Sequence, residues 1–332
     1  MFISGRARGK PGEVRRILVV RLSSMGDIIH TLPAAATLKH SWPGAQLTWA
    51  VNSRWIQLLE GNPFVDRLVP IDRGRGRGVL EALRDLRRER HDIAVDFQGL
   101  IQSALVGTVA RPEHLFGYHQ SQVRERLAAL FYSDRVSVSA KHIVDRHLEL
   151  ARAAGASTIL RQFPLPEGRP EGELPGEPFV LACPLAGWTG KQWPLERYAA
   201  LAARVRGELG MEFVVNGPPG AADALASIAG ARVHLSGIPG LIDATRRAAA
   251  VVGIDSGPLH LAAALCKHGV AIFGPTDPAR NGPYGSSFTV LRDPGAVTTY
   301  KRRAEYDTSM LRIQPDAVFE ALSARVGSRR PA

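Results

Sequence analysis

Short runs of apolar residues alternate with longer amphipathic segments along most of the chain. An apolar run of strand length followed by a segment with helical periodicity is typical of βα units and of parallel sheets. In the first half, this pattern predicts strands at 17–21, 47–51, 67–71 and 93–97, and helices at 28–40, 54–60, 80–88, 100–110, 124–131 and 142–154.

The alternation is interrupted at 162–178, where five prolines and three glycines crowd together. Because proline lacks a backbone donor and fixes φ, this stretch does not fit inside a sheet or a helix. We therefore expect a first domain at 1–165, a linker at 166–178 and a second domain at 179–332. In the second domain the pattern predicts strands at 179–183, 212–216, near 233, 251–254 and 270–273, and helices at 195–209, 221–229, 241–249, 258–267 and about 315–326.

Two such domains in succession predict an α/β protein with two Rossmann-like, doubly wound parallel sheets facing a central cleft. Ligands of such sheets bind outside the carboxyl ends of the strands. The last helix, at about 315–326, is a candidate to pack back on the N-terminal domain. This layout alone does not name a reaction.

The composition indicates an ordered protein of two domains. The chain has 332 residues, of which 45% are hydrophobic and 22% charged. Cys183 and Cys266 lie in apolar segments far apart, so we interpret both as small core residues in a reducing compartment. No apolar signal region follows the basic N-terminus, and no run approaches the roughly 20 apolar residues of a membrane span. We expect a soluble or at most peripheral protein.

The chain is strongly basic, with a formal net charge of +11. Nucleic acid, an anionic membrane surface or a phosphorylated substrate would each explain this charge, and so would an arginine-rich surface without a special partner. Aromatic residues make up only 7% and do not alternate with the basic stretches, as they would in a single-strand binder. Nucleic acid is therefore the weakest of the three.

The first strand-to-helix junction, 21–33, carries the first candidate for chemistry. It contains neither G-x-G-x-x-G nor a Walker loop, which disfavours a dinucleotide or a P-loop nucleotide as ligand. Asp27 lies just beyond the carboxyl end of a strand, where it can cap a helix or act as a base, and both readings stay open. Gly26 before it suggests a close backbone approach.

Three loops of the second half also follow strands. In 252–260, Asp255 or Ser256 would cap a helix that starts with Pro258, and the amides of Ser256 and Gly257 offer a seat for a phosphate. His260 lies in the first turn of that helix. The loop at 273–285 contains Thr276, and the loop at 184–194 contains Lys191, a compact charge suited to a diphosphate. A structural helix start and a solvated lysine are the plain alternatives.

No D-x-D pair, H-E-x-x-H motif or Cys/His cluster occurs in the sequence, so we expect no metal. A leaving diphosphate would then be stabilised by Lys191 and by helix amides rather than by a bound cation.

Taken together, these loops resemble the lipopolysaccharide heptosyltransferase family, glycosyltransferase family 9, and within it the heptosyltransferase I group. The opening motif is Ser23-Ser-Met-Gly-Asp27 with His30-Thr-Leu-Pro33, and the similarity spans about 15–325. The donor-side motifs are Lys191-Gln-Trp-Pro194, Asp255-Ser-Gly257 with His260, and Gly274-Pro-Thr-Asp-Pro278. The remaining matches are Asp96-Phe-Gln98-Gly99 with Ser103, the stretch 124–132 and Val144-Asp-Arg146.

The resemblance implies a GT-B fold and an inverting transfer of L-glycero-D-manno-heptose from ADP-heptose to a Kdo residue of lipid A–Kdo. It makes the first domain acceptor-binding and the second donor-binding, with Asp27 as general base and Lys191 stabilising the departing ADP. The implied donor contacts are Ala186, Gly187, Lys191, Asp255, Ser256, Gly257, His260 and Thr276. The expected acceptor contacts are Ser24, Met25, Gly26, Arg73, Arg75, Arg77, Gln98, Arg124 and Arg146.

The same resemblance predicts that the protein is cytoplasmic and associates peripherally with the inner membrane. We also expect the protein to need no cofactor beyond its ADP-heptose substrate and to have no nucleic-acid partner. Two alternatives stay open: a family-9 transferase with another nucleotide sugar or acceptor, and a non-catalytic protein that binds anions or nucleic acid. The run Arg73-Gly-Arg-Gly-Arg77 suits a solvated loop as well as lipid A phosphates.

Overall fold

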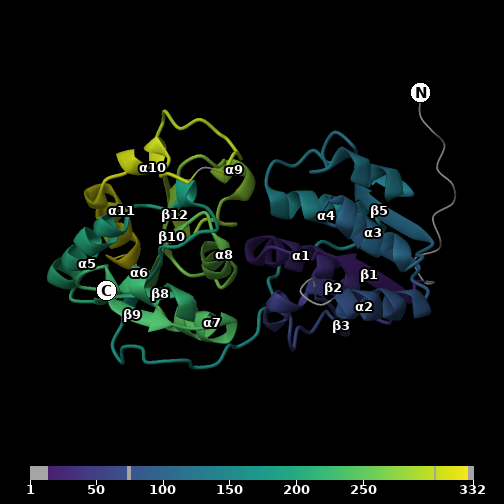
Figure 1. Cartoon of the computed structure of the whole chain (residues 1–332), viewed down its shortest axis with the longest axis horizontal. Coiled ribbons are helices and arrows are strands. Elements are labelled where there is room, and N and C mark those ends of the chain that lie inside the picture. The colour runs from purple at the N-terminus through teal and green to yellow at the C-terminus, as the bar shows by residue number, and fades with distance from the viewer. Residues whose placement is uncertain (1–13, 73–75, 303, 328–332) are drawn as a thin grey trace. The chain divides into compact units, whose positions relative to one another are not determined.

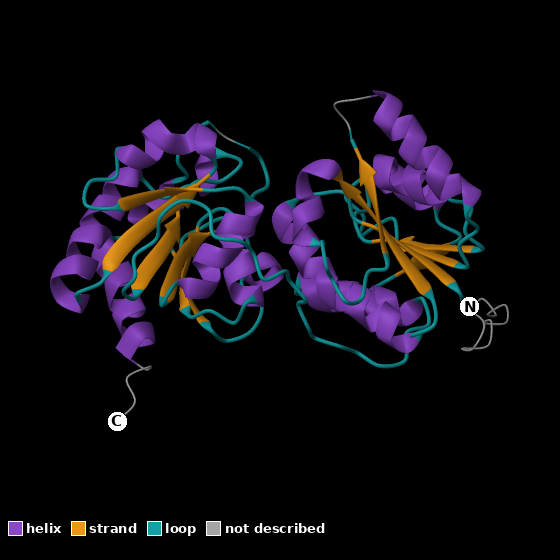
Figure 2. Ribbon diagram, turned by 90° about the horizontal axis from the view of Figure 1, so that it is seen from below, coloured by secondary structure: helices purple, strands orange, loops and turns teal. Residues whose placement is uncertain are grey.

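The computed structural model describes residues 14–72, 76–302 and 304–327. The chain forms two compact units, which divide between Pro166 and Glu167 (Figure 1). Each unit contains a six-stranded parallel sheet with helices on both faces (Figure 2). The predicted fold class, two doubly wound α/β sheets, is confirmed for both units.

The sheet of the first unit has the strand order β3-β2-β1-β4-β5-β6. β1 is central because residues 17–20 form a continuous apolar run, and all four side chains are fully buried, as expected for a parallel strand covered on both faces. The strands are β1 (Arg16–Val20), β2 (Gln46–Asn52), β3 (Arg67–Ile71), β4 (Ile93–Asp96), β5 (His114–Tyr118) and β6 (Asp134–Val136). The helices are α1 (Met25–Ser41), α2 (Gly76–Arg88), α3 (Ile101–Val109) and α4 (Ile143–Ala153), with 3-10 helices η1 (Ser53–Leu58) and η2 (Arg126–Phe131).

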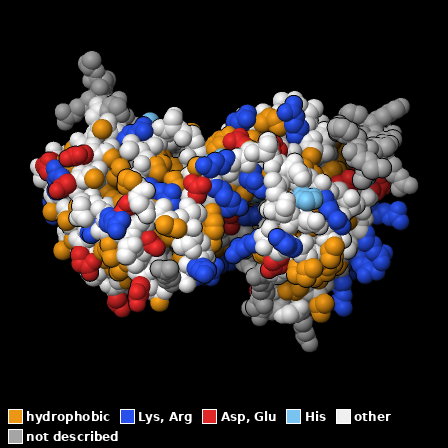
Figure 3. All heavy atoms as spheres, turned by 90° about the horizontal axis from the view of Figure 1, so that it is seen from above, with side chains coloured by type: hydrophobic (Ala, Val, Ile, Leu, Met, Phe, Trp, Pro, Cys, Tyr) orange, Lys and Arg blue, Asp and Glu red, His pale blue; other side chains and the backbone are white. Residues whose placement is uncertain are grey.

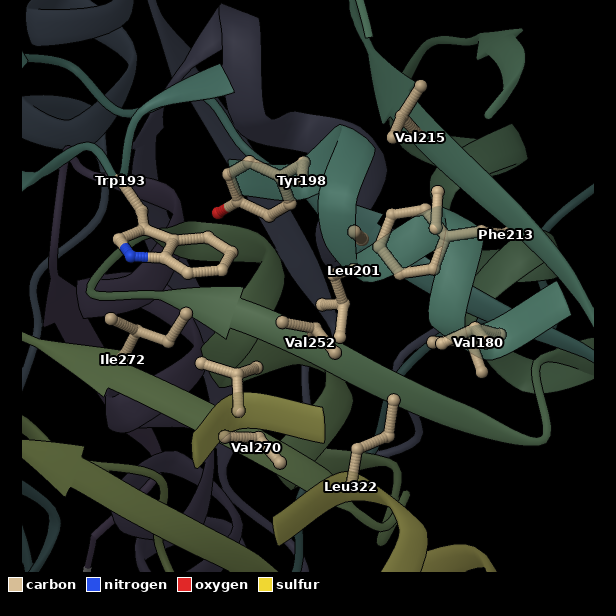
Figure 4. Close-up of a cluster of buried hydrophobic side chains, with 14 of the residues drawn as sticks. Val180, Trp193, Tyr198, Leu201, Phe213, Val215, Val252, Val270, Ile272 and Leu322 are labelled. Atoms are coloured by element: carbon tan, nitrogen blue, oxygen red, sulfur yellow. The ribbon is translucent and has the colours of Figure 1, made fainter. Parts of the chain in front are cut away.

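The sheet of the second unit has the order β12-β11-β10-β7-β8-β9. Its strands are β7 (Phe179–Cys183), β8 (Glu212–Gly217), β9 (Arg232–Leu235), β10 (Ala250–Ile254), β11 (Gly269–Phe273) and β12 (Phe288–Arg292). Its helices are α5 (Leu195–Leu209), α6 (Ala222–Ala226), α7 (Ile238–Arg247), α8 (Gly257–Ala264), α9 (Pro278–Asn281), α10 (Thr308–Arg312) and α11 (Pro315–Gly327), with η3 (Thr189–Lys191) and η4 (Pro219–Ala221). A core cluster around Trp193 and Tyr198 fills one face of this sheet (Figure 4).

Both sheets wind outward from a central first strand and then restart on its other side. The strand order therefore reverses between β1 and β4 in the first unit, and between β7 and β10 in the second. Ligands of doubly wound sheets bind at this switch point, outside the carboxyl ends of the two strands. The topology thus marks one candidate half-site in each unit.

The last helix, a candidate to pack back on the N-terminal domain, packs within the second unit. α11 packs against α5 and against strands β10, β11 and β12 of the second unit. Its apolar residues Val318, Phe319 and Leu322 are buried in the core cluster of that unit. The helix stays there because its apolar face completes this core.

Several local predictions also need correction. Strands β5, β6 and β12 were not predicted, and the segments predicted as helices at 54–60 and 124–131 form the 3-10 helices η1 and η2. β5 escapes the pattern because it begins with the exposed His114 and contains Gly117, while β6 has only three residues. Neither strand offers the long apolar run that marks β1.

The proline-rich segment has no helix or strand between α4 and β7. Its later part is hydrogen-bonded to the second unit: the Arg169 amide donates to the Pro239 carbonyl at 3.1 Å, and the Gly237 amide donates to the Glu171 carboxylate at 2.6 Å. Gly168 has a φ of +85°, and a Cβ there would lie 2.7 Å from the Asp243 nitrogen. Only glycine fits this close approach.

The two cysteines differ in environment. Cys183 is buried at the end of β7, and burial raises the pKa of its thiol to about 12. Cys266 is exposed just after α8, with a left-handed φ of 54°. The interpretation of Cys266 as a core residue is therefore wrong, because the apolar segment around it ends in a turn.

Candidate active site

The half-site of the first unit is built where β1 ends and α1 begins. Arg21 follows β1 and is only 6% exposed, and Asp27 lies in the first turn of α1. The Arg21 Nη2 and the Asp27 Oδ1 are 2.7 Å apart, and the Arg21 Nη1 donates to the Phe97 carbonyl. The side chain of Asp27 remains 38% exposed. The carboxylate is therefore held by a buried guanidinium and still reachable by a ligand.

Asp27 also closes a capping arrangement with Ser24. Its Oδ2 accepts hydrogen bonds from the Ser24 amide at 3.0 Å and from the Ser24 hydroxyl at 2.8 Å. Ser24 is the N-cap of α1, so Asp27 is not the cap itself but sits three residues later. This position is the usual acidic partner of a capping box. The capping contact and a role as base use the same carboxylate, so neither excludes the other.

The electrostatics of Asp27 favour its ionised form. Burial acts to raise the pKa of this carboxyl, but the Arg21 ion pair, the Ser24 hydrogen bonds and nearby His147 outweigh it, and the pKa lies below its usual value. His147 itself is fully buried on α4, with its Nδ1 2.5 Å from the Tyr118 hydroxyl. The carboxylate is therefore ionised at neutral pH, as a proton acceptor must be.

Replacing Arg21 with Met should move the acid limb of the kcat/KM profile to higher pH. Burial of Asp27 would persist while the ion pair that lowers its pKa is lost, and only the Ser24 hydrogen bonds and His147 would remain to favour the ionised form. The measurement is a pH–rate profile of each variant. Lys39→Met is the matched control, because Lys39 forms an ion pair with Asp66 at the other end of α1. An unshifted acid limb in Arg21→Met would show that Arg21 does not set the ionisation of Asp27.

A tight turn after β4 supports the junction that carries Asp27. The Gln98 side-chain oxygen accepts from the Leu22 amide at 2.7 Å, across the switch point between β1 and β4. Asp96, fully buried, accepts from the hydroxyls of Ser103 and Tyr132, each at 2.7 Å, and from the Gln98 amide. Burial raises the pKa of Asp96, and the hydrogen bonds oppose that rise. Asp96 therefore acts as a structural anchor of this turn.

The predicted acceptor residues are only partly gathered at this edge. Ser24 is exposed, whereas Met25 and Gly26 are buried in the first turn of α1. Arg124 is exposed just before η2, and Arg146 is half-buried on α4, with its guanidinium 5.5 Å from the centre of the Tyr118 ring. Arg77 lies in α2, and Arg73 and Arg75 lie outside the described residues. The acceptor contacts stay a prediction.

The half-site of the second unit brings three predicted donor residues together. The Lys191 Nζ lies 2.5 Å from the Asp255 Oδ2, and the His260 Nε2 lies 3.4 Å from the Asp255 Oδ1. Asp255 is only 6% exposed. Burial would raise the pKa of Asp255, but the hydrogen bond with His260 and the charge of Lys191 hold it well below its usual value. The result is a buried ionised carboxylate that fixes a lysine and a histidine.

The start of α8 presents hydrogen-bond donors at the same edge. Ser256 is the N-cap, Gly257 begins the helix and Pro258 follows. The first amides of a helix have no partner within it, and the helix dipole favours an anion there. Within the part of the chain that the structure describes, the buried hydroxyls of Ser256 and Thr276 have no hydrogen-bond partner. Such hydroxyls are typical of a site whose ligand supplies the missing bond.

The loop after β7 leaves backbone rather than side chains near this edge. Gly187 is exposed, and a Cβ built on it would meet nothing within 4 Å. The Ala186 carbonyl accepts from the Gln192 side chain at 3.1 Å. The Lys191 Nζ lies 5.2 Å from the centre of the Trp188 ring, a contact that sequence reasoning did not identify. The Trp188 ring therefore makes a cation–π contact with the Lys191 ammonium group.

Sequence reasoning also missed Arg21. The available signal was a charged residue placed directly after a fully buried strand, where a long side chain has to find a partner at the carboxyl edge. The sequence does not reveal that this partner is Asp27, six residues later and across a turn.

Similarity to known proteins identifies the family and the fold. Residues 79–308 match the model of glycosyltransferase family 9 (heptosyltransferase). The chain is 31% identical to lipopolysaccharide heptosyltransferase 1 of Pseudomonas aeruginosa, over 82% of each chain. Among solved structures it resembles Escherichia coli heptosyltransferase WaaC with ADP, at a TM-score of 0.75 and 26% identity, covering 93% of this chain and 99% of that one.

A second structure, the same E. coli enzyme with ADP-2-deoxy-2-fluoro heptose, matches at a TM-score of 0.72 and 25% identity, covering 92% of this chain and 98% of that one. The likeness extends over both units, which confirms the GT-B class. The resemblance first seen in the loops is confirmed by the family match and by the curated relative. The chain belongs to glycosyltransferase family 9, the heptosyltransferase family.

Proposed function

We propose that the protein transfers L-glycero-D-manno-heptose from ADP-heptose to a Kdo residue of lipid A–Kdo, with inversion at the anomeric carbon, in synthesis of the lipopolysaccharide inner core. Membership of family 9 and similarity to lipopolysaccharide heptosyltransferase 1 support heptose transfer. The observation that carries the proposal is the Lys191–Asp255–His260 cluster beside the first turn of α8. Membership of a transferase family disfavours the non-catalytic alternative.

The second unit would hold the donor. The amides of Ser256 and Gly257 and the charge of Lys191 suit a diphosphate, and the hydroxyls of Ser256 and Thr276 suit its oxygens or the adjoining sugar. As the bond between the anomeric carbon and the phosphate oxygen breaks, both bonding electrons leave with ADP. A fixed cation and preorganised amides stabilise this negative charge without a large rearrangement.

The first unit would hold the acceptor. The Asp27 carboxylate takes the proton of the acceptor hydroxyl as that oxygen bonds to the anomeric carbon from the face opposite ADP. Arg21 keeps Asp27 ionised and fixes one of its oxygens, while the other is held by Ser24. Exposed arginines such as Arg124, together with the run Arg73-Gly-Arg-Gly-Arg77, would attract the phosphates of lipid A.

A thermal-shift panel with ADP, UDP and GDP tests the donor assignment. A ligand that binds only the folded protein stabilises it by about 2.7 kcal/mol at a hundredfold excess over its Kd. We expect ADP to raise the melting temperature well above the shifts caused by UDP and GDP. A larger shift with UDP or GDP would favour a family-9 transferase that uses another nucleotide sugar. Stabilisation by RNA alone would contradict the proposal.

We further propose that transfer needs no metal ion. Across 14–72, 76–302 and 304–327, no three or more His, Cys, Asp or Glu side chains are grouped so as to hold a metal. Lys191 and the α8 amides supply positive charge where the diphosphate would sit. Saturating EDTA is therefore expected to leave most of the activity in a heptose-transfer assay. Complete loss that Mg²⁺ or Mn²⁺ restores would show that a cation holds the diphosphate.

The acceptor is an amphiphile, so the protein would work in the cytoplasm at the inner face of the membrane. Among its described helices, none is both long and apolar enough to cross a bilayer. Association would then be peripheral, through surface contacts alone.

A further inference from the structure

The segment 124–131 presents two leucines to solvent. Residues 126–131 form the 3-10 helix η2, in which side chains three positions apart lie on the same side. Leu127 and Leu130 are such a pair, and they are 60% and 65% exposed. Ala128 and Ala129 between them are buried against the core of the first unit. The helix therefore packs through Ala128, Ala129 and the partly buried Phe131, and turns Leu127 and Leu130 outward.

Exposed arginines border these leucines. Arg124 and Arg126 are both exposed, and no ion pair involving either is found among the described residues. Glu125 lies between these two arginines in the sequence. Its carboxylate accepts a hydrogen bond from the Ile101 amide at the start of α3, at 2.7 Å. Figure 3 shows that Lys and Arg side chains and hydrophobic side chains also lie side by side on the unit that carries the N-terminus.

This surface is linked directly to the turn that supports Asp27. The Glu125 amide donates to the Gly99 carbonyl at 3.1 Å, and the Tyr132 hydroxyl at the end of η2 bonds to Asp96. Gln98, which precedes Gly99 in this turn, accepts a hydrogen bond from the Leu22 amide through its side-chain oxygen. A membrane that touches η2 would thus lie at the carboxyl edge of the sheet, where the acceptor sugar has to arrive.

We propose that the η2 surface, made of Arg124, Arg126, Leu127 and Leu130, docks on an anionic lipid bilayer. The leucines would enter the boundary between headgroups and acyl chains, and the arginines would pair with lipid phosphates. Two leucines expose too little apolar area for a stable protein interface, which buries at least about 1,200 Å² in total. The choice of an acceptor at this edge rests on the proposed function, but the binding of lipid does not.

Co-sedimentation with vesicles tests the proposal. Wild-type protein should bind vesicles of phosphatidylethanolamine and phosphatidylglycerol, and bind those of phosphatidylcholine much less. The double variant Leu127→Ser, Leu130→Ser should lower the partition coefficient about tenfold or more, because it removes the two apolar side chains that would be buried in the bilayer. The matched control is Leu311→Ser, at a leucine that is 40% exposed on α10 of the second unit. It should bind as the wild type does.

Kinetics and oligomeric state separate the outcomes. With a deacylated, water-soluble acceptor, the double leucine variant should turn over like the wild type, whereas with acceptor in anionic vesicles its rate should fall with binding. Absence of heptose transfer by the wild type would contradict the proposed function, but it would not change the result of the vesicle-binding experiment. Wild-type binding by the leucine variant, or equal binding to neutral vesicles, would overturn the docking surface. A wild-type dimer that the leucine variant converts to monomer, seen by sedimentation velocity, would assign the surface to a second copy instead.

Discussion

Asp27→Asn is expected to lower kcat by about 10²–10⁴-fold, the range typical of losing a general base. Asparagine keeps the shape of the side chain and can still accept from the Ser24 amide, but it cannot take a proton from the acceptor. ADP affinity should not change, because the donor residues all belong to the second unit. Steady-state kinetics with ADP-heptose, combined with the Kd of ADP, measures both quantities.

The substitution also leaves the buried Arg21 without its carboxylate partner, so the melting temperature should fall as well. Asp66→Asn is the control, because Asp66 likewise loses an ion pair, with Lys39, but lies beside the starting end of β2, where it accepts from the Leu47 amide. That variant should keep wild-type turnover. If Asp27→Asn retained full turnover, Asp27 would be only the capping partner of Ser24.

Lys191→Met is expected to lower kcat by about 10²–10³-fold, as when one donor to a developing anion is removed. The leaving ADP would lose its fixed positive charge, while the α8 amides remain. The variant should also be less stable, because Asp255 would be left buried with only His260 beside it. Breaking a buried ion pair from one side costs about 3–5 kcal/mol. Kinetics and a denaturant titration of the same preparation measure the two effects.

Arg232→Gln provides the matched control for Lys191. Arg232 forms an ion pair with Glu212 in the same unit, but both side chains are about 40% exposed and lie where β8 and β9 begin. Its loss should change neither kcat nor stability by much, since exposed pairs contribute about 0–1 kcal/mol. If Lys191→Met kept the wild-type kcat, Lys191 would not stabilise the departing ADP, and the α8 amides alone would do so.

The hydrophobic pattern predicted the strands that are buried on both faces of a sheet, because such strands have a continuous run of apolar residues. β1, β7, β10 and β11 are of this kind, and all were predicted within a residue of their observed bounds. β6 and β12 at the edges escaped, since an edge strand has fewer neighbours to bury it and needs fewer apolar residues. The 3-10 helices η1 and η2 were taken for α-helices because six residues cannot distinguish the two periods.

The donor cluster was accessible from the sequence for a different reason. Asp255, Ser256, Gly257 and His260 lie within six residues of one another, so a helix start fixes their arrangement locally. Lys191 could be placed beside them only because β7 and β10 are neighbours, which is a property of the topology. The pairing of Arg21 with Asp27 depends on the path of a turn, which no periodicity encodes.

The turn at 96–99 has a consequence for how related sequences can drift. Two of its contacts to the junction at Asp27 use main-chain atoms: the Phe97 amide donates to the Val20 carbonyl, and the Phe97 carbonyl receives Arg21. These contacts do not depend on the side chain at 97. The Phe97 ring is nevertheless only 1% exposed and its centre lies 5.2 Å from that of the His147 ring, so homologues should keep a large apolar residue there. Gln98 contributes through its side chain, Asp96 accepts through its carboxylate, and Gly99 has a φ of +70°. Substitutions at these three positions should be rare and should appear together with changes at the base of α1.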